Sequence, residues 1–239
     1  MSRWLHADEN GMLVEGKCVW LHSLSTSKQT LYHIDPKRGG KAIERMGVLP
    51  EYRGRFVHHF WSAYLGLGFE HSISNEHIIS KLTYFEDLGQ SWARHLKRLL
   101  QRACREPEAK PSDKWRKSYH RCLEQGRKEN PWKPPVLKSG QRDWVAKPNA
   151  LNLTDRLNEH EEWVLAFLYH EEAPFTYNQA ERDVRMAKIR QELSGCFHSW
   201  KGAEIFAATR SYLSTCVKQW VPLLEALTDA MSGTTSTLA

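Results

Sequence analysis

The stretch Phe175-Thr176-Tyr177-Asn178-Gln179-Ala180-Glu181-Arg182-Asp183 is the most informative part of this chain, because it sets one carboxylate near the start of a predicted helix. Asn178 suits the N-cap position, and Glu181 three residues later completes a capping box. Helix stability alone would account for such a glutamate. A chemical role for Glu181 therefore needs support from the rest of the chain.

The composition is that of a folded protein without a membrane anchor. The chain has 239 residues, of which 41% are hydrophobic, enough for one large domain or a domain that carries an insertion. It has no run of about eighteen apolar residues and no basic region followed by an apolar one at its N-terminus, so we expect a cytoplasmic protein. The five cysteines form no Cys-x-x-Cys pair, which argues against a disulfide framework and a zinc site.

Basic residues are concentrated in the segment from Gln101 to Lys147. This segment contains 13 Lys and Arg against 6 Asp and Glu, an excess of +7, whereas the whole chain carries +6. Prolines and aromatic residues are interleaved with these charges. Such a composition suits a nucleic-acid backbone, through counterion release and base stacking. A helical insertion whose charges face only solvent would look the same, and the sequence leaves both interpretations open.

The hydrophobic pattern predicts a mixed α/β chain. We expect strands at Trp4–Asp8, Cys18–Ser23, Thr30–Ile34, Arg55–His59 and Glu70–Ile73, with a turn at Val14–Lys17. We expect a short helix ending at Met46 with Gly47 as the cap, and helices over Asn75–Ala103 and Thr154–Tyr169 and from Asn178 onward. We expect one or two more helices over Gly202–Leu227. The Ser- and Thr-rich tail after Gly233 is expected to fray.

Three stretches resemble, in the right order, the acid-bearing motifs of insertion sequence 66 family transposases, which are bacterial mobile-element enzymes. They are His6-Ala7-Asp8-Glu9-Asn10-Gly11, Phe56-Val57-His58-His59-Phe60-Trp61 and Asn178-Gln179-Ala180-Glu181-Arg182-Asp183-Val184-Arg185-Met186. Further matching segments are Trp20-Leu21-His22, Pro36-Lys37-Arg38-Gly39, Gly47-Val48-Leu49-Pro50, Ser194-Gly195-Cys196-Phe197 and Gly202-Ala203-Glu204-Ile205-Phe206. Because the matches extend from His6 to about Leu227, they favour this family over an unrelated nuclease on the same fold.

The resemblance implies an α/β fold, a ribonuclease-H-like mixed sheet flanked by helices, with a basic helical insertion. It divides the chain into a first part of the core at 1–100, the basic insertion at 101–150, the C-terminal core helices at 151–232 and a frayed tail at 233–239. It brings Asp8, His59 and Glu181 together at one edge of the sheet.

The same resemblance implies metal-dependent DNA cleavage and strand transfer. In-line displacement at phosphorus can be clamped by two metal ions about 3.5–4 Å apart, and Mg²⁺ takes oxygen ligands. The implied catalytic positions are Asp8, His59 and Glu181, with Asp8 and Glu181 as the magnesium ligands. The residues expected to contact DNA phosphates are Arg116, Lys117, Arg121, Arg182, Arg185 and Lys188. The implied partner is DNA, with self-association or binding to a full-length transposase as a further expectation, and with no small-molecule substrate and no membrane.

The chain departs from the family pattern at the second acid. The family reads Val-His-Asp where this chain reads Val57-His58-His59, and an imidazole offers one neutral nitrogen, suits zinc or nickel better than magnesium and cannot bridge two ions. We therefore expect an impaired transposase or, as the alternative, a non-catalytic DNA-binding remnant. A zinc site from four histidines is a further alternative, although their spacing matches no known ligand pattern: His58, His59, His71 and His77.

Two other departures point the same way. Where the family reads Cys-Asn-Ala-His-His-Leu-Arg-Glu-Leu, this chain keeps Asn75, His77 and Leu82 but differs at five positions, Ser74, Glu76, Ile78, Ser80 and Lys81. Tyr177 replaces an asparagine. The family carries a large N-terminal portion for end recognition, whereas Met1 lies seven residues before Asp8, so we expect that portion to be missing. Such drift is what relaxed selection would leave.

Overall fold

The computed structural model describes residues 4–106, 112–133, 146–170, 173–176 and 178–234, and for residues 178–182 and 194 it describes the backbone alone. The chain divides into two compact units. One combines residues 1–71 with 177–239, and the other comprises 72–176. The second unit is therefore inserted into the first in chain order. The predicted division at 1–100, 101–150, 151–232 and 233–239 stays a prediction.

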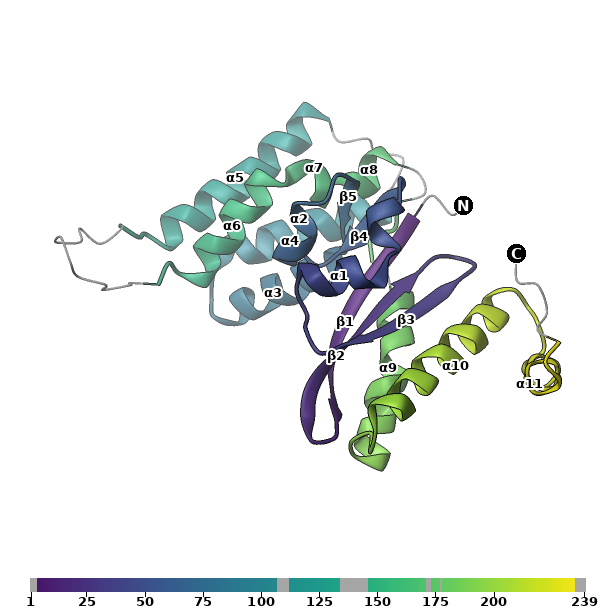
Figure 1. Cartoon of the computed structure of the whole chain (residues 1–239). Helices are drawn as coiled ribbons and strands as arrows, with labels where there is room; N and C mark the ends of the chain where they lie inside the picture. Colours follow the sequence, from purple (N-terminus) through teal and green to yellow (C-terminus); the bar gives the residue numbers. More distant parts are fainter. Residues whose placement is uncertain (1–3, 107–111, 134–145, 171–172, 177, 235–239) are drawn as a thin grey trace. The chain divides into compact units, whose positions relative to one another are not determined.

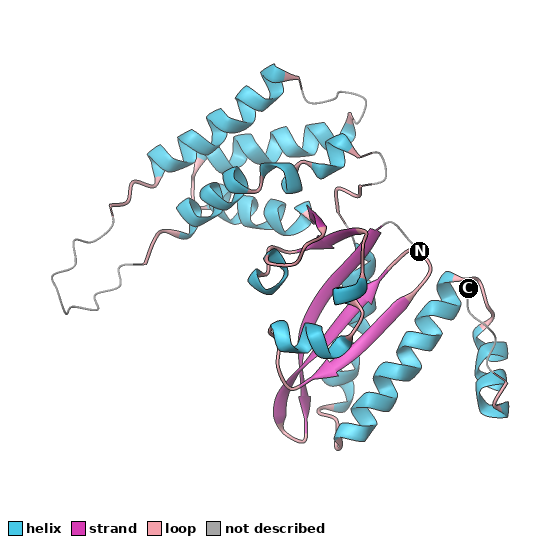
Figure 2. Ribbon diagram, turned by 45° about the horizontal axis from the view of Figure 1, so that its top comes forward, coloured by secondary structure: helices cyan, strands magenta, loops and turns pink. Residues whose placement is uncertain are grey.

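The first unit is built on a mixed sheet in the order β3-β2-β1-β4-β5 (Figures 1 and 2). Its strands are β1 (Trp4–Val14), β2 (Lys17–Ser25), β3 (Thr30–Asp35), β4 (Arg55–His58) and β5 (Glu70–Ile73). Strand β2 pairs antiparallel with both β1 and β3, and β4 pairs parallel with β1. A mixed sheet flanked by helices, as the sequence predicts, is confirmed.

The hairpin between β1 and β2 is longer than predicted. Its turn lies where the sequence indicates, because Val14 pairs with Lys17 and the two residues between them, Glu15 and Gly16, adopt φ values of 53° and 74°. This is the left-handed backbone of a two-residue hairpin turn. The prediction that β1 ends at Asp8 is wrong: the ladder continues through the polar stretch Glu9-Asn10-Gly11, and Gly11 pairs with Trp20.

The two faces of the sheet carry separate apolar clusters. One face is covered by α9 (Asn178–Ser194) and α10 (Trp200–Lys218); its cluster includes Met12, Val14, Leu21, Tyr32, Ile34, Ala187, Phe197, Ala203 and Ala207. The other is covered by α1 (Gly40–Met46), the short 3-10 helix η1 (Leu49–Glu51) and α2 (Ser62–Leu65); its cluster includes Leu5, Ala7, Leu24, Ile43, Leu49, Phe56 and Tyr64. Because strand side chains alternate, even-numbered residues of β1 face α9 and α10, and odd-numbered ones face α1. Gly47 caps α1 at φ 73°, as predicted.

The second unit is helical. It contains α3 (Asn75–Asp87), α4 (Ser91–Arg105), α5 (Asp113–Glu129), α6 (Asn149–Glu159), α7 (Glu161–Val164) and α8 (Ala166–Tyr169). Helices α3, α4, α5 and α6 pack in chain order. Close packing of α4, α5 and α6 depends on Gly126, where an added Cβ would lie 2.6 Å from Thr154 Cγ2 and 2.8 Å from Trp92 Cδ2.

Two long helices predicted for this unit are interrupted. The expected helix Asn75–Ala103 breaks after Asp87, where Gly89 adopts φ 81° and lets α4 turn back on α3. The expected helix Thr154–Tyr169 is divided at His160 and Leu165. Val164, Leu165 and Ala166 are consecutive and all buried, which a single straight helix cannot achieve on one face. The segment Gly202–Leu227, for which one or two helices are predicted, carries two, α10 and α11 (Leu223–Ser232). Over the described residues, no helix is long and apolar enough to cross a membrane.

Candidate active site

The pairing of β1 with β4 brings the first two predicted site residues to the same level. In the parallel ladder Leu5 pairs with Phe56 and His6 with Val57. Continued by two residues, this register sets Asp8 level with position 59, and paired residues of parallel strands point to the same face. Strand β4 ends at His58, and Phe60 adopts φ 60°, so the chain leaves the sheet at this point. His59 is therefore a strand-exit residue one position beyond the end of β4, whereas the prediction made it the last residue of the strand.

Asp8 and His6 share the face that α9 covers. Both are even-numbered residues of β1, like Met12 and Val14, which pack in the cluster with Ala187 of α9. Helix α9 lies against β1 and β2, and it begins at Asn178 as predicted. The backbone of Glu181 thus belongs to the helix that lies on this face. The side chains of Glu181 and Arg182 lie outside the described residues, so the full set of Asp8, His59 and Glu181 stays a prediction.

The surroundings of Asp8 are rich in nitrogen. His6 is buried, and burial first, then Lys218 and His59, lower its pKa to about 3. The effect of His59 on His6 means that the two imidazoles lie near each other. His6 is accordingly neutral near pH 7. Asp8 accepts a hydrogen bond from the Glu9 backbone N–H at 2.9 Å.

Glu9 is the acid next to Asp8, but it faces the opposite side of the sheet. Its carboxylate accepts a hydrogen bond from the Tyr64 hydroxyl, and Arg38 Nη2 lies 3.3 Å from its Oε2 atom. Burial is the main cause of its raised pKa. The Arg38 guanidinium lies between two indole rings, 4.7 Å from Trp20 and 4.8 Å from Trp61. Glu9 is thus engaged by Tyr64 and Arg38 on the opposite side of the sheet from Asp8. No local pattern in the sequence indicates these partners of Glu9, although the alternation of side chains along a strand predicts that Glu9 and Asp8 face opposite sides.

The four histidines weighed as a zinc site do not form one cluster within the first unit. His58 faces the same side of the sheet as Phe56, and the centroids of their stacked rings lie 5.4 Å apart. The His58 Nε2 atom lies 3.0 Å from the Nδ1 atom of His71. His71 Nε2 lies 3.0 Å from the Leu67 carbonyl, which can only accept, so the His71 Nδ1 atom of a neutral ring accepts from His58. His59, the next residue along the chain, has the alternate strand position, and His77 belongs to the helical unit. Among the described residues, no group of three metal-ligating side chains occurs.

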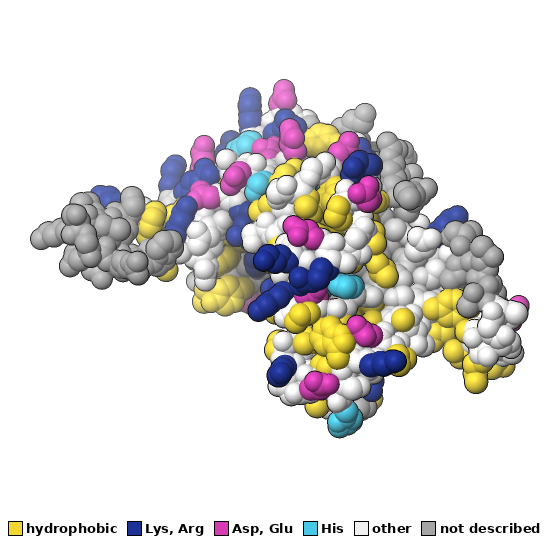
Figure 3. Space-filling model, viewed as in Figure 1, with side chains coloured by type: hydrophobic (Ala, Val, Ile, Leu, Met, Phe, Trp, Pro, Cys, Tyr) yellow, Lys and Arg dark blue, Asp and Glu magenta, His cyan; other side chains and the backbone are white. Residues whose placement is uncertain are grey.

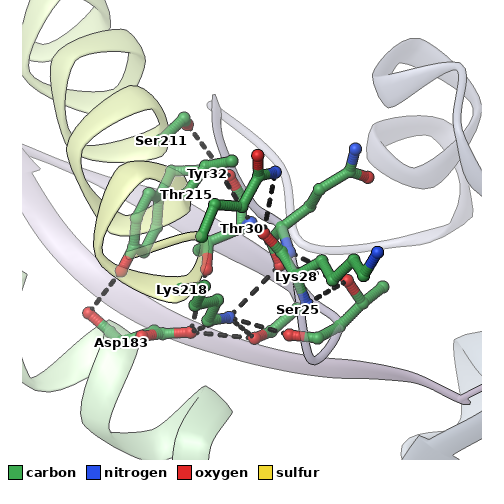
Figure 4. A network of polar contacts seen from close by, with 11 residues as sticks. Ser25, Lys28, Thr30, Tyr32, Asp183, Ser211, Thr215 and Lys218 are labelled. Carbon is green, nitrogen blue, oxygen red and sulfur yellow. Dashed lines mark hydrogen bonds and ion pairs between the residues drawn. The ribbon is translucent and has the colours of Figure 1, made fainter. Parts of the chain in front are cut away.

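A buried ion pair fixes α9 and α10 to the hairpin of β2 and β3 (Figure 4). Lys218 Nζ lies 3.2 Å from Asp183 Oδ2 and 2.5 Å from Ser25 Oγ, and Asp183 also accepts from Ser25 at 2.9 Å. Tyr32 donates to the Asp183 carbonyl at 2.8 Å, and burial raises the Tyr32 pKa to about 12. Ser25 pairs with His6 in the ladder. The pair therefore locks the helix that carries Glu181 beside the strand that carries Asp8.

Sequence reasoning missed this pair. Asp183 lies two residues after Glu181. The only sign of its burial in the sequence is that the apolar residues Val184 and Ala187 lie on the same side of the helix. Lys218 has no motif that would single it out. Burial lowers its pKa, and Asp183 opposes that shift.

Residues 1–205 match the model of the transposase IS66 family. The chain belongs to this family. Among solved structures, one chain of the cryo-electron microscopy structure of the simian T-cell lymphotropic virus intasome in complex with PP2A regulatory subunit B56 gamma is similar at 12% identity and a TM-score of 0.27. The similarity covers 62% of this chain and 57% of that chain. A comparison with curated proteins finds no match.

The basic residues expected to contact DNA in this IS66 family member lie in both units. Arg116, Lys117 and Arg121 are exposed on α5, and Arg116 Nε donates to the Tyr169 hydroxyl at 2.9 Å. Arg185 and Lys188 are exposed on α9. Figure 3 shows Lys and Arg side chains intermixed with Asp and Glu on the visible face of the helical unit.

Besides Asp8, nitrogen-bearing side chains lie near this part of β1. Mg²⁺ prefers oxygen ligands in octahedral geometry. Among the side chains described at this level of β1 and β4, Asp8 supplies the carboxylate, while His6 and His59 supply imidazoles and Lys218 adds a nearby positive charge.

Proposed function

We propose that this chain is the catalytic-type domain of a DNA transposase, on a ribonuclease-H-like sheet, in which His59 has removed two-metal cleavage and DNA binding remains. The strand order, with β1 antiparallel to β2 and parallel to β4, supports the fold that the family implies. The observation that supports the proposal is the β1 to β4 register, which pairs His6 with Val57 and, extended by two residues, would bring position 59 level with Asp8.

The loss of cleavage follows from ligand chemistry. Two-metal displacement needs carboxylate oxygens that can be shared between ions. The His59 imidazole has a single lone-pair nitrogen when neutral and no charge to offset a divalent ion. The remaining role of the domain is to hold DNA through the exposed cations of α5 and α9, whose Lys and Arg contacts act mainly on phosphates and therefore carry little sequence information.

The test of catalysis is to restore the carboxylate. We expect no magnesium-dependent cleavage or joining by the unaltered chain on pre-nicked transposon ends. His59→Asp should bind Mg²⁺ or Mn²⁺ by calorimetry, and the double variant His59→Asp with Glu181→Ala should bind it more weakly. Efficient magnesium-dependent joining by the unaltered protein that is abolished by Glu181→Ala would overturn the proposed loss and identify a working transposase.

The test of DNA binding is its dependence on salt. Each neutralised phosphate adds about 0.9 to the slope of log affinity against log salt. Replacing Arg116, Lys117 and Arg121 by Gln should flatten this slope by about 2–3. A control with Lys17, Lys28 and Lys41 replaced by Gln removes the same charge from exposed positions of the first unit. If both variants behave like the unaltered chain, α5 is a solvated surface and the predicted contacts are wrong.

A further inference from the structure

The exit of strand β4 carries position 59 away from the sheet. The strand ends at His58, Phe60 is buried at φ 60°, and Trp61 is the N-cap of α2. A left-handed backbone at a residue with a Cβ is sparsely populated and persists where the surrounding structure holds it. The paired residues of β1 and β4 end at His6 and Val57, so the ladder alone does not hold this exit.

Trp61 is held by two neighbours that both bind Glu9. The Arg38 guanidinium lies 4.8 Å from the centre of the Trp61 ring, and the Tyr64 ring meets that ring edge-on at 4.9 Å. The Tyr64 hydroxyl donates to Oε1 of Glu9, and Arg38 Nη2 lies 3.3 Å from its Oε2 atom. The Glu9 side chain is only 5% exposed. Because a buried carboxylate tolerates the loss of its partners poorly, both neighbours are fixed in orientation.

A second indole holds the guanidinium from its other side. Arg38 lies 4.7 Å from the centre of the Trp20 ring, so its planar group lies between Trp20 and Trp61. A guanidinium stacks on aromatic faces better than a lysine ammonium does. The backbone next to Arg38 is anchored as well, since His22 Nε2 lies 3.4 Å from the Lys37 carbonyl oxygen.

These contacts join the neighbours of the two predicted site positions. Glu9 directly follows Asp8, and Trp61 lies two residues after His59. One connection runs from Glu9 through Arg38 to Trp61, and the other runs from Glu9 through Tyr64 to Trp61. Both cross from β1 to the exit of β4 on the face opposite to Asp8. Together they fix a spacing that lies beyond the last pair of the ladder.

We propose that Glu9 and Arg38 are positioning residues that act through Trp61 and set the place of the side chain at position 59 relative to Asp8. The inference rests on the proposed function, because position 59 is the second acid position of the family. It gives a role to two of the segments by which the chain resembles its family, Trp20-Leu21-His22 and Pro36-Lys37-Arg38-Gly39, which meet at this point.

The first experiment follows the His59 imidazole in the full chain without metal. Long-range proton–nitrogen NMR at one fixed pH records its nitrogen shifts, which report tautomer and surroundings, and His59→Gln assigns its signals. Arg38→Gln should shift and broaden the His59 signals, because the exit is no longer held. Arg38→Lys keeps a positive charge beside Glu9 but stacks less well between the indoles, so it should have an intermediate effect.

Two further variants separate position from charge and from general loosening. Trp61→Leu leaves the pair of Arg38 and Glu9 intact but removes its contact with the exit, and it should reproduce the effect of Arg38→Gln on His59. Arg45→Gln is the matched control. Arg45 binds the buried carboxylate of Asp35 at 2.6 Å and is 48% exposed, against 42% for Arg38. Its loss should lower the melting temperature comparably and leave the His59 signals in place.

The second experiment measures Mn²⁺ affinity by calorimetry in the His59→Asp background. Loss of a group that orients a metal ligand typically weakens metal binding by about 10–100-fold. Arg38→Gln should therefore weaken Mn²⁺ binding by about tenfold, Arg38→Lys should recover part of the loss, and Arg45→Gln should leave the affinity unchanged.

The outcomes separate this inference from the proposed function. Unchanged His59 signals in Arg38→Gln and Trp61→Leu would overturn the inference, as would an equal effect of Arg45→Gln. An effect of Arg38→Gln that Trp61→Leu does not reproduce would show that charge acts and not position. If Arg38→Gln unfolds, Arg38→Lys and Trp61→Leu decide the same question. If the His59 signals respond as expected while His59→Asp binds no Mn²⁺, the positioning stands and the metal chemistry of the proposed function is wrong.

Discussion

The two faces of the sheet differ in the polar groups that they carry. On the face of α1, Glu9 is buried and engaged by Tyr64 and Arg38, and Arg38 is clamped by two indole rings. On the face of α9, the level of Asp8 holds two imidazoles, while the nearby Lys218 is paired with Asp183. Both faces are built around the same strand, one residue apart. The difference shows that adjacent residues of one strand can place their side chains in quite different electrostatic environments.

The framework and the chemistry can change separately because they depend on different side chains. Burial of Leu5, Ala7 and Phe56 does not involve position 59, and the Lys218 to Asp183 pair holds α9 independently of any metal. Substitutions in the two sets should therefore have very different effects on stability.

The largest effect is expected for the buried ion pair behind the Asp8 face. Asp183→Ala should lower the free energy of unfolding by about 3–5 kcal/mol, because it leaves the Lys218 ammonium buried without its counter-charge. Replacing both, Asp183→Leu with Lys218→Met, should recover much of this loss. Denaturant unfolding measures both, and Asp87→Ala, at an exposed position on α3, should stay within about 0.5 kcal/mol. A small effect of Asp183→Ala would mean that water reaches the pair.

A smaller effect is expected on the α1 face. Tyr64→Phe should destabilise by about 1–3 kcal/mol, because the buried Glu9 carboxylate loses a donor. The loss of this hydrogen bond should raise the already raised pKa of Glu9 further. Stability from such a group is present below its ordinary pKa and is lost as pH rises through the folded value, so the variant should be affected more at pH 7 than at pH 4. Tyr84→Phe, at an exposed ring, is the control. If both variants lose the same free energy of unfolding, the Tyr64 hydroxyl does not stabilise the buried Glu9.

The sequence predicts the framework better than the site. Gly47, the turn at Val14–Lys17 and the start of α9 are local features with strong residue preferences, and all three are found. The breaks at Gly89 and His160 were missed because they serve tertiary packing, which brings adjacent residues such as Val164 and Leu165 into one core. The pairing of Lys218 with Asp183 joins residues 35 positions apart, and no local pattern encodes it. The side of the sheet that each acid faces depends on register, which the motifs do not specify.

His22, also on the α1 face, should make the stability of the fold depend on pH. Burial is the main cause of the lowered pKa of His22, whose neighbours include His33, Asp35 and Arg38. A histidine of this kind stabilises the fold above its ordinary value of 6.5, and this stability is lost as pH falls through the folded value. His22→Gln should flatten the fall in stability below pH 6.5 by up to about 1.4 kcal/mol per pH unit. Thermal unfolding from pH 7 to 5 measures the slope, with the exposed His198→Gln as control. An unchanged slope would show that His22 protonates without unfolding.

The smallest effect, and the one that bears most directly on the Asp8 face, is expected for His59→Asp without metal. The new carboxylate lies half-buried at a strand exit and repels Asp8, so we expect a loss of less than about 1 kcal/mol. Adding Mg²⁺ should reverse the sign, because a ligand that binds only the folded state stabilises it by about 2.7 kcal/mol at one hundred times its dissociation constant. The unaltered chain should give no magnesium-dependent rise in melting temperature, and neither should His198→Asp, which adds a carboxylate at an exposed position. If the unaltered chain and His59→Asp are stabilised equally by Mg²⁺, the metal binds away from position 59, and the difference between the two faces does not explain the chemistry.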